Sequence, residues 1–151
     1  MLLVFLNYMH KIERSALINF SASKMFDLVN DVSCYPKFLK WCKSSRVISQ
    51  TDSEMEAELE VAWKVLHKVF STHNYLKKGE SIRLELVSGP FQSMEGCWHF
   101  KQLREDACKI SMEIEFEFKN SLSNMLFSSI FSQICDSLMD SFIKRAHEVY
   151  G

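Results

Sequence analysis

Apolar residues in the C-terminal segment 122–150 recur at steps of three and four, which places them on one face of a helix. That face comprises Phe127, Phe131, Ile134, Leu138, Phe142, Ala146 and Val149, and a second row of Leu126, Ile130, Cys135, Met139 and Ile143 widens it. No charged residue lies between Ser121 and Cys135. We therefore expect the first half of the helix to be embedded, the second half to have a wet side, and a broad apolar surface to cover both.

Most of the chain before this helix alternates between apolar and polar residues with a period of two, which predicts strands. The clearest case runs from Met55 to Val65, where inward apolar positions alternate with the glutamates at 54, 56, 58 and 60. The predicted strands cover residues 11–20, 46–50, 54–65, 69–77, 81–87, 91–103 and 108–118. Lys78-Gly79 and Gly89-Pro90 are typical of turns between them.

Two short helical segments are expected between the first two strands. Ser21 is a good N-cap, and Met25, Phe26 and Val29 follow at helical spacing. The Tyr35-Pro36 step interrupts the chain, and residues 37–41 are predicted to form one further helical turn.

Hairpin-length connections indicate antiparallel pairing, and one polar face per strand indicates a sheet that is covered on one side only. The pattern therefore predicts an α+β fold in which a curved antiparallel sheet of about seven strands wraps around the long C-terminal helix, a helix-grip arrangement. A curved sheet and a straight helix tend to leave a cavity, which here would be apolar. A solid core of interdigitating side chains is the alternative.

The composition is that of an ordinary globular protein: 151 residues, 47% hydrophobic, with a formal net charge of −1. We expect one domain over residues 9–151 and interpret residues 1–8 as a leader, with a membrane-touching arm as the alternative. The charge argues against a generally nucleic-acid-binding surface. The five cysteines form neither a disulfide framework nor a zinc motif, so we expect reduced thiols in a bacterial cytoplasm, with peripheral contact with the inner membrane as an addition.

Three stretches resemble the START-like coenzyme Q-binding and polyketide-cyclase-related family. They are Val29-Asn30-Asp31-Val32 with Tyr35-Pro36, Phe38-Leu39 and Trp41-Cys42; Leu86 to Phe91 continued by Gly96, Trp98 and Phe100; and Ile114 to Phe118 followed by Asn120 and Leu122. The resemblance covers residues 9–150. Ser88 and Lys40 depart from the family pattern, both at loop positions.

The resemblance implies a hydrophobic tunnel that binds ubiquinone or a related isoprenoid lipid without catalysis, in support of respiration. A bacterial branch of the family is associated instead with binding the large ribosomal subunit and blocking subunit joining, which is the alternative function. A cyclase-like activity is a third and weaker interpretation. A ubiquinone-like lipid is thus the expected ligand.

The residues expected at the cavity and its mouth are Phe26, Tyr35, Phe38, Leu39, Trp41, Leu59, Trp63, Phe91, Met94, Trp98, Phe100, Phe116, Phe127, Phe131 and Ile134. A basic stripe of Lys37, Lys40, Lys43 and Arg46 is a candidate surface for lipid phosphates or ribosomal RNA, with solvated lysines as the alternative. We predict no catalytic residue and no metal site, because the five histidines share no ligand spacing and no nucleophile or phosphate-binding motif occurs.

Overall fold

The computed structural model describes residues 9–119 and 121–151, so the interpretation of residues 1–8 as a leader lies outside it. A seven-stranded antiparallel sheet is ordered β1-β7-β6-β5-β4-β3-β2. Its strands are β1 (His10–Ile18), β2 (Cys42–Gln50), β3 (Glu54–Trp63), β4 (Leu66–Lys77), β5 (Ser81–Ser88), β6 (Phe91–Arg104) and β7 (Ala107–Phe118). The helices are α1 (Ala22–Asn30), the 3-10 helix η1 (Val32–Lys37) and α2 (Ser121–Tyr150).

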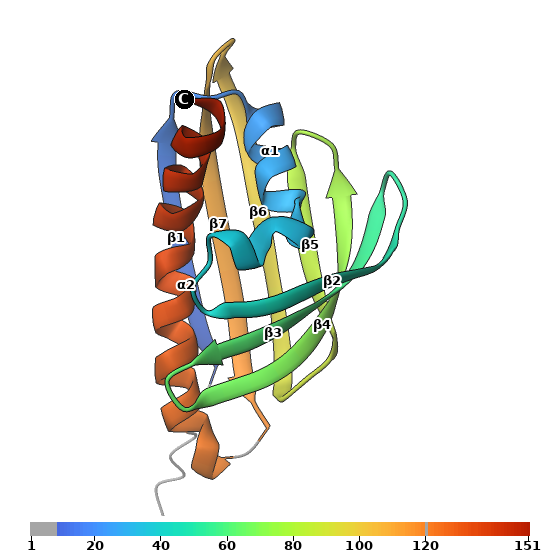
Figure 1. The fold of residues 1–151 in the computed structure, drawn as a ribbon, viewed down its shortest axis with the longest axis vertical. Coiled ribbons are helices and arrows are strands. Elements are labelled where there is room, and N and C mark those ends of the chain that lie inside the picture. Colours follow the sequence, from blue (N-terminus) through green and yellow to red (C-terminus); the bar gives the residue numbers. More distant parts are fainter. Residues whose placement is uncertain (1–8, 120) are drawn as a thin grey trace, which may run out of the picture.

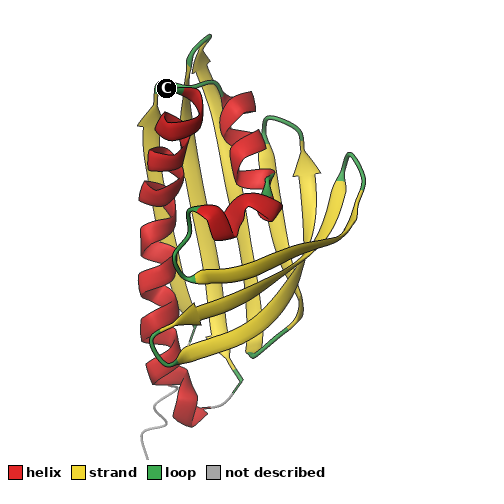
Figure 2. Ribbon diagram, in the orientation of Figure 1, coloured by secondary structure: helices red, strands yellow, loops and turns green. Residues whose placement is uncertain are grey.

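All three helices lie on one face of the sheet (Figures 1 and 2). The long helix α2 runs along β1 and β7, while β2, β3 and β4 curve around the same face (Figure 1). This is the helix-grip arrangement that the sequence predicts, with two short helices after the first strand, and the fold-class prediction is confirmed.

Aromatic side chains hold α2 against the sheet. The ring of Phe131 on α2 lies 4.7 Å from that of Phe116 and 5.1 Å from that of Phe91. Further along α2, the ring of Phe142 lies 5.4 Å from that of Trp98 on β6 and 5.5 Å from that of Tyr35. The Phe116–Phe131 pair is tilted and the other three are edge-to-face, and such aromatic pairs add to the stabilisation that burial itself provides.

The outer face of the sheet carries the alternating glutamates, as the pattern indicates. Glu58 pairs with Arg46 at 3.5 Å, and Glu60 accepts a hydrogen bond from Ser44 and lies 2.9 Å from His67. These hydrogen bonds from His67 and Ser44 lower the pKa of the Glu60 carboxyl below its ordinary value. The glutamate row is therefore a solvated, ion-paired surface.

Several predicted boundaries are wrong. The helical turn predicted at residues 37–41 lies earlier, as η1, because Pro36 removes only its own N–H while the amides of Cys34 and Phe38 still bond to the carbonyls of Asp31 and Tyr35. Strand β2 begins at Cys42 instead of residue 46, since backbone pairing with β3 extends through polar positions that carry no apolar alternation. Strand β4 likewise starts earlier, at Leu66, and β1 ends at Ile18.

Both ends of the predicted apolar face of α2 differ from expectation. Leu126 near its start and Val149 near its end are exposed, so the first half of the helix is not embedded throughout. Val65, predicted to point inward, is also exposed, because β3 ends at Trp63 and Val65 lies in the two-residue turn before Leu66. The buried positions of α2 among the described side chains run from Ser128 to Ala146.

Replacing Gly89 with alanine should destabilise the fold much more than replacing Gly79. Gly89 has φ 146°, and an added Cβ would lie 2.6 Å from the Cβ of Phe70, whereas Gly79 has φ 74° and its nearest neighbour would be 3.9 Å away. We expect a loss of about 3 kcal/mol for Gly89→Ala and about 1 kcal/mol for Gly79→Ala. Urea unfolding of both variants measures this, and equal losses would contradict the close approach of Gly89 to β4.

Candidate functional site

A cavity of about 90 Å³ lies between the sheet and α2. Of the residues predicted to form a ligand cavity, those that line it are Tyr35, Trp41, Leu59, Met94, Trp98, Phe131 and Ile134. The curved sheet and the straight helix thus leave a space here, although a small one. It is smaller than the cavity of about 150 Å³ that accommodates benzene in an engineered protein.

Two polar residues line this otherwise apolar cavity, and sequence reasoning missed them. The hydroxyl of Thr72 donates a hydrogen bond of 2.7 Å to the amide oxygen of Asn74, and both side chains are buried. They sit on β4 between the inward residues Phe70 and Leu76, in the same period-two phase. The sequence pattern of β4 could have identified them, because a polar side chain at an inward-facing strand position destabilises the fold unless it is hydrogen-bonded.

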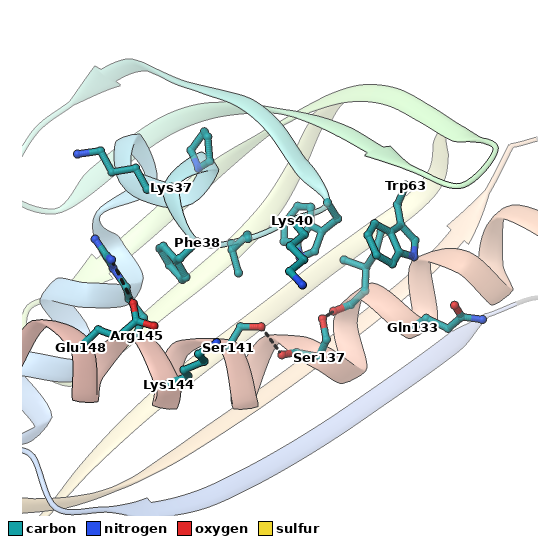
Figure 3. A pocket seen from close by; sticks show the side chains of 14 residues that line it. Lys37, Phe38, Lys40, Trp63, Gln133, Ser137, Ser141, Lys144, Arg145 and Glu148 are labelled. Carbon is teal, nitrogen blue, oxygen red and sulfur yellow. Dashed lines mark hydrogen bonds and ion pairs between the residues drawn. The ribbon is translucent and has the colours of Figure 1, made fainter.

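A wider groove of about 590 Å³ lies outside, between α2 and the segment from Pro36 to Trp41 (Figure 3). Its residues are Pro36, Lys37, Phe38, Leu39, Lys40, Trp41, Trp63, Gln133, Ile134, Ser137, Ser141, Lys144, Arg145 and Glu148. The predicted mouth residues Phe38, Leu39, Trp41 and Trp63 therefore belong to this groove. Lys144 and Arg145, which sequence reasoning missed, join it because α2 passes opposite the loop.

The groove is basic. Lys37, Lys40 and Lys144 make no ion pair among the described residues, and Glu148 is the one carboxylate in the groove lining. Glu148 pairs with Arg145 at 3.4 Å, and the guanidinium of Arg145 lies 5.2 Å from the centre of the Phe38 ring. Four cations thus face one anion in a chain whose formal net charge is −1.

The predicted basic stripe is divided between two surfaces. Lys37 and Lys40 line the groove, whereas Lys43 and Arg46 lie on β2, where they pair with Glu60 at 3.9 Å and Glu58 at 3.5 Å. The spacing of three residues does not keep the stripe together, because η1 ends at its first member, Lys37, and β2 begins within it, at Cys42.

Trp41 lies between the groove and the cavity and lines both. Its indole N–H is buried without a hydrogen-bond partner. Next to it, the Tyr35 hydroxyl donates a hydrogen bond to the carbonyl of Val29, and burial raises the pKa of that phenol above its ordinary value. Burial, followed by the nearby Glu60, raises the pKa of the Cys42 thiol to about 11.

The remaining predicted cavity residues pack elsewhere in the core or beside it. Phe26 contacts Phe100 with ring centres 5.8 Å apart, and the ring of Phe127 lies 5.7 Å from that of Phe118. Phe91 and Phe116 belong to the aromatic cluster around Phe131 described above. These five side chains, Phe26, Phe91, Phe100, Phe116 and Phe127, hold α1 and α2 in place without lining the cavity or the groove.

Within residues 9–119 and 121–151, no three His, Cys, Asp or Glu side chains are grouped so that they could hold a metal ion. In the same residues, none of the helices combines the length and the apolar character needed to span a bilayer. The five cysteines are free thiols.

A curved sheet that grips one long helix around an apolar cavity defines the class of helix-grip proteins. The chain belongs to the family described as polyketide cyclase / dehydrase and lipid transport, whose model matches residues 18–143. The aromatase/cyclase Zhui from Streptomyces sp. R1128 shares the fold, with a TM-score of 0.81, 11% identity and coverage of 92% of this chain and 94% of that one.

Two relatives differ in what their names describe. The chain is 42% identical to the ribosome association toxin RatA of Vibrio cholerae over 143 residues, which cover 95% of this chain and 99% of that protein. It is 30% identical to the mitochondrial coenzyme Q-binding protein COQ10 homolog B of Xenopus laevis, over 91% of this chain and 58% of that protein. The predicted family resemblance is thereby confirmed, while the absence of catalysis stays a prediction.

Removing the Thr72 hydroxyl alone should cost more stability than removing the whole polar pair. Thr72→Val leaves the amide of Asn74 buried without its donor, which costs about 1–3 kcal/mol. In Thr72→Val/Asn74→Leu no polar group is left unpaired, so we expect much of that loss to be recovered. Chemical unfolding of the single and double variants measures the difference. A double variant that loses the sum of the single losses would contradict it.

Proposed function

We propose that this protein associates with the ribosome, by binding the large subunit through the basic groove and blocking subunit joining. The proposal is supported by similarity over nearly full length to a protein named for ribosome association. Ribosome association, which the sequence analysis gives as the alternative function, is therefore preferred here to quinone binding. The small interior cavity, by contrast, gives little room for the isoprenoid quinone that the sequence interpretation favours.

The observation that carries the proposal is the concentration of unpaired cations in the groove. Outside it, basic residues such as Lys43, Arg46 and Arg83 are neutralised by neighbouring glutamates. Lys37, Lys40 and Lys144 keep their full charge free for a partner. A ribosome offers a dense array of phosphates, and lysines that contact phosphates release counterions and so bind in a salt-dependent way.

Reversing the charge of the groove should abolish the effect on ribosomes. Purified wild-type protein, added to ribosomes on a sucrose gradient, should deplete joined ribosomes and comigrate with the large subunit. In Lys37→Glu/Lys40→Glu/Lys144→Glu both effects should be lost. In the variants that carry only one of these three substitutions, the slope of log affinity against log salt concentration should be less steep than in the wild type by about one per lost phosphate contact.

The control reverses two lysines on the outer face of the sheet. Lys101 and Lys109 lie opposite each other on β6 and β7 and are exposed, so Lys101→Glu/Lys109→Glu alters net charge without touching the groove. This variant should act like the wild type. If it loses activity as the groove variant does, or if wild-type protein leaves the gradient unchanged, groove-mediated ribosome association is refuted.

A second candidate function is the binding of an apolar ligand, such as an isoprenoid quinone, in the interior cavity. It is supported by the unpartnered indole N–H of Trp41 at the wall between cavity and groove, since a buried donor without a partner is costly. A quinone ring would require Trp41 to move, because the cavity holds only about 90 Å³. Ligand entry would then occur from the groove.

Filling the cavity should remove such a ligand. Wild-type protein and variants are purified from a quinone-producing bacterium, and bound lipid is detected by solvent extraction and by native mass spectrometry. Ala57→Leu is the variant whose larger side chain fills the cavity. Ala57 lines the cavity, whereas Ala62 on the same strand does not, so Ala62→Leu is the control. We expect an isoprenoid in wild type and control and a strong decrease in Ala57→Leu. Its repeated absence from all three proteins would contradict the carrier function.

A further inference from the structure

We propose that the basic groove binds an unpaired segment of RNA, with one base stacked on Trp63 and the adjacent phosphates held by Lys40 and Lys144. This inference rests on the proposed ribosome association and names the chemistry of its partner. It assigns a recognition role to Trp63, in addition to the purely electrostatic role of the lysines.

Trp63 is the one exposed tryptophan of the three. Its side chain is 37% exposed, against 8% for Trp41 and 4% for Trp98. It ends β3 at the lip of the groove, above Gln133 of α2 (Figure 3). An indole left exposed beside cations offers a flat face on which a nucleic-acid base can stack.

A backbone hydrogen bond joins the loop that carries Lys40 to the strand that ends in Trp63. The amide of Ala62 donates a hydrogen bond of 2.8 Å to the carbonyl of Trp41, and the amide of Cys42 donates one of 3.0 Å to the carbonyl of Leu39, so the turn that carries Lys40 is bonded to the end of β3. Lys40 and Trp63 line the same groove. A phosphate and its own base can therefore contact the two side chains at the same time.

A second contact holds the lip in place over α2. The ammonium of Lys64, in the turn after Trp63, donates a hydrogen bond of 2.8 Å to the side-chain oxygen of Gln133. Lys64 adopts φ 54°, the left-handed conformation that this tight turn requires. The indole is thus positioned before any partner arrives, which reduces the ordering that binding would require.

These features favour single-stranded RNA over a duplex or an acidic protein. In a duplex both faces of each base are already stacked, so an exposed indole has no base face to contact. An acidic peptide would satisfy the lysines but would make no use of the flat face of Trp63. Stacking tolerates any base, so the groove should bind unpaired RNA with little sequence preference.

The test uses a short fluorescently labelled oligouridine at low salt, followed by anisotropy and by the intrinsic fluorescence of the protein. Wild-type protein should bind with quenching of its tryptophan emission. Trp63→Ala should lose about tenfold in affinity, and Trp63→Phe should bind nearly as wild type but without the quenching. Lys40→Glu should also bind more weakly, and Leu17→Ala, which removes an exposed apolar side chain from β1, should have no effect.

Three results would overturn the inference. They are equal affinities of wild type and Trp63→Ala, tighter binding of a duplex RNA of the same length, and equal competition by polyglutamate. If ribosome association on the gradient persists while oligouridine does not bind, only this inference fails. If oligouridine binds as described but the gradient is unchanged, ribosome association fails and the RNA site stands.

Discussion

The fold depends on the contact between one helix and the concave face of one sheet. Phe131 contacts Phe91 and Phe116, and Phe142 contacts Trp98 and Tyr35 further along α2. Between these two aromatic contacts the sheet curves away from the straight helix, and the cavity lies there. The position of the cavity thus follows from the two places where large rings keep sheet and helix in contact.

The groove arises from the same contact. Because Phe142 packs against Tyr35 and Phe38, the segment after η1 is held alongside the C-terminal half of α2. That half is where charged residues return to the helix, so Lys144 and Arg145 face Lys37 and Lys40 across a recess. An apolar contact therefore determines where the cations of two distant segments meet.

The fold could be predicted from the sequence because alternation and helical spacing are local signals. Alternation predicts the strands that have one apolar face, such as β3 and β7. The predicted range of β2 is too short, because its pairing with β3 passes through Lys43, Ser44 and Ser45, where apolar and polar residues do not alternate. The site was less predictable. The strand and helix residues of the apolar lining, such as Leu59 and Ile134, can be predicted because they occupy inward-facing positions of their elements. The presence of Lys144 and Lys40 in one groove depends on tertiary packing, which no local pattern encodes.

Like Ile134, Trp41 lines both the cavity and the groove. Its neighbour Lys40 belongs to the groove, and its carbonyl accepts a hydrogen bond from the strand that ends in Trp63. A ligand that enters the cavity from the groove would pass Trp41, which is adjacent to Lys40 in the groove lining. Under the two proposals above, ligand entry and partner binding would therefore involve neighbouring residues, so that occupation of one site would change the free energy of occupying the other.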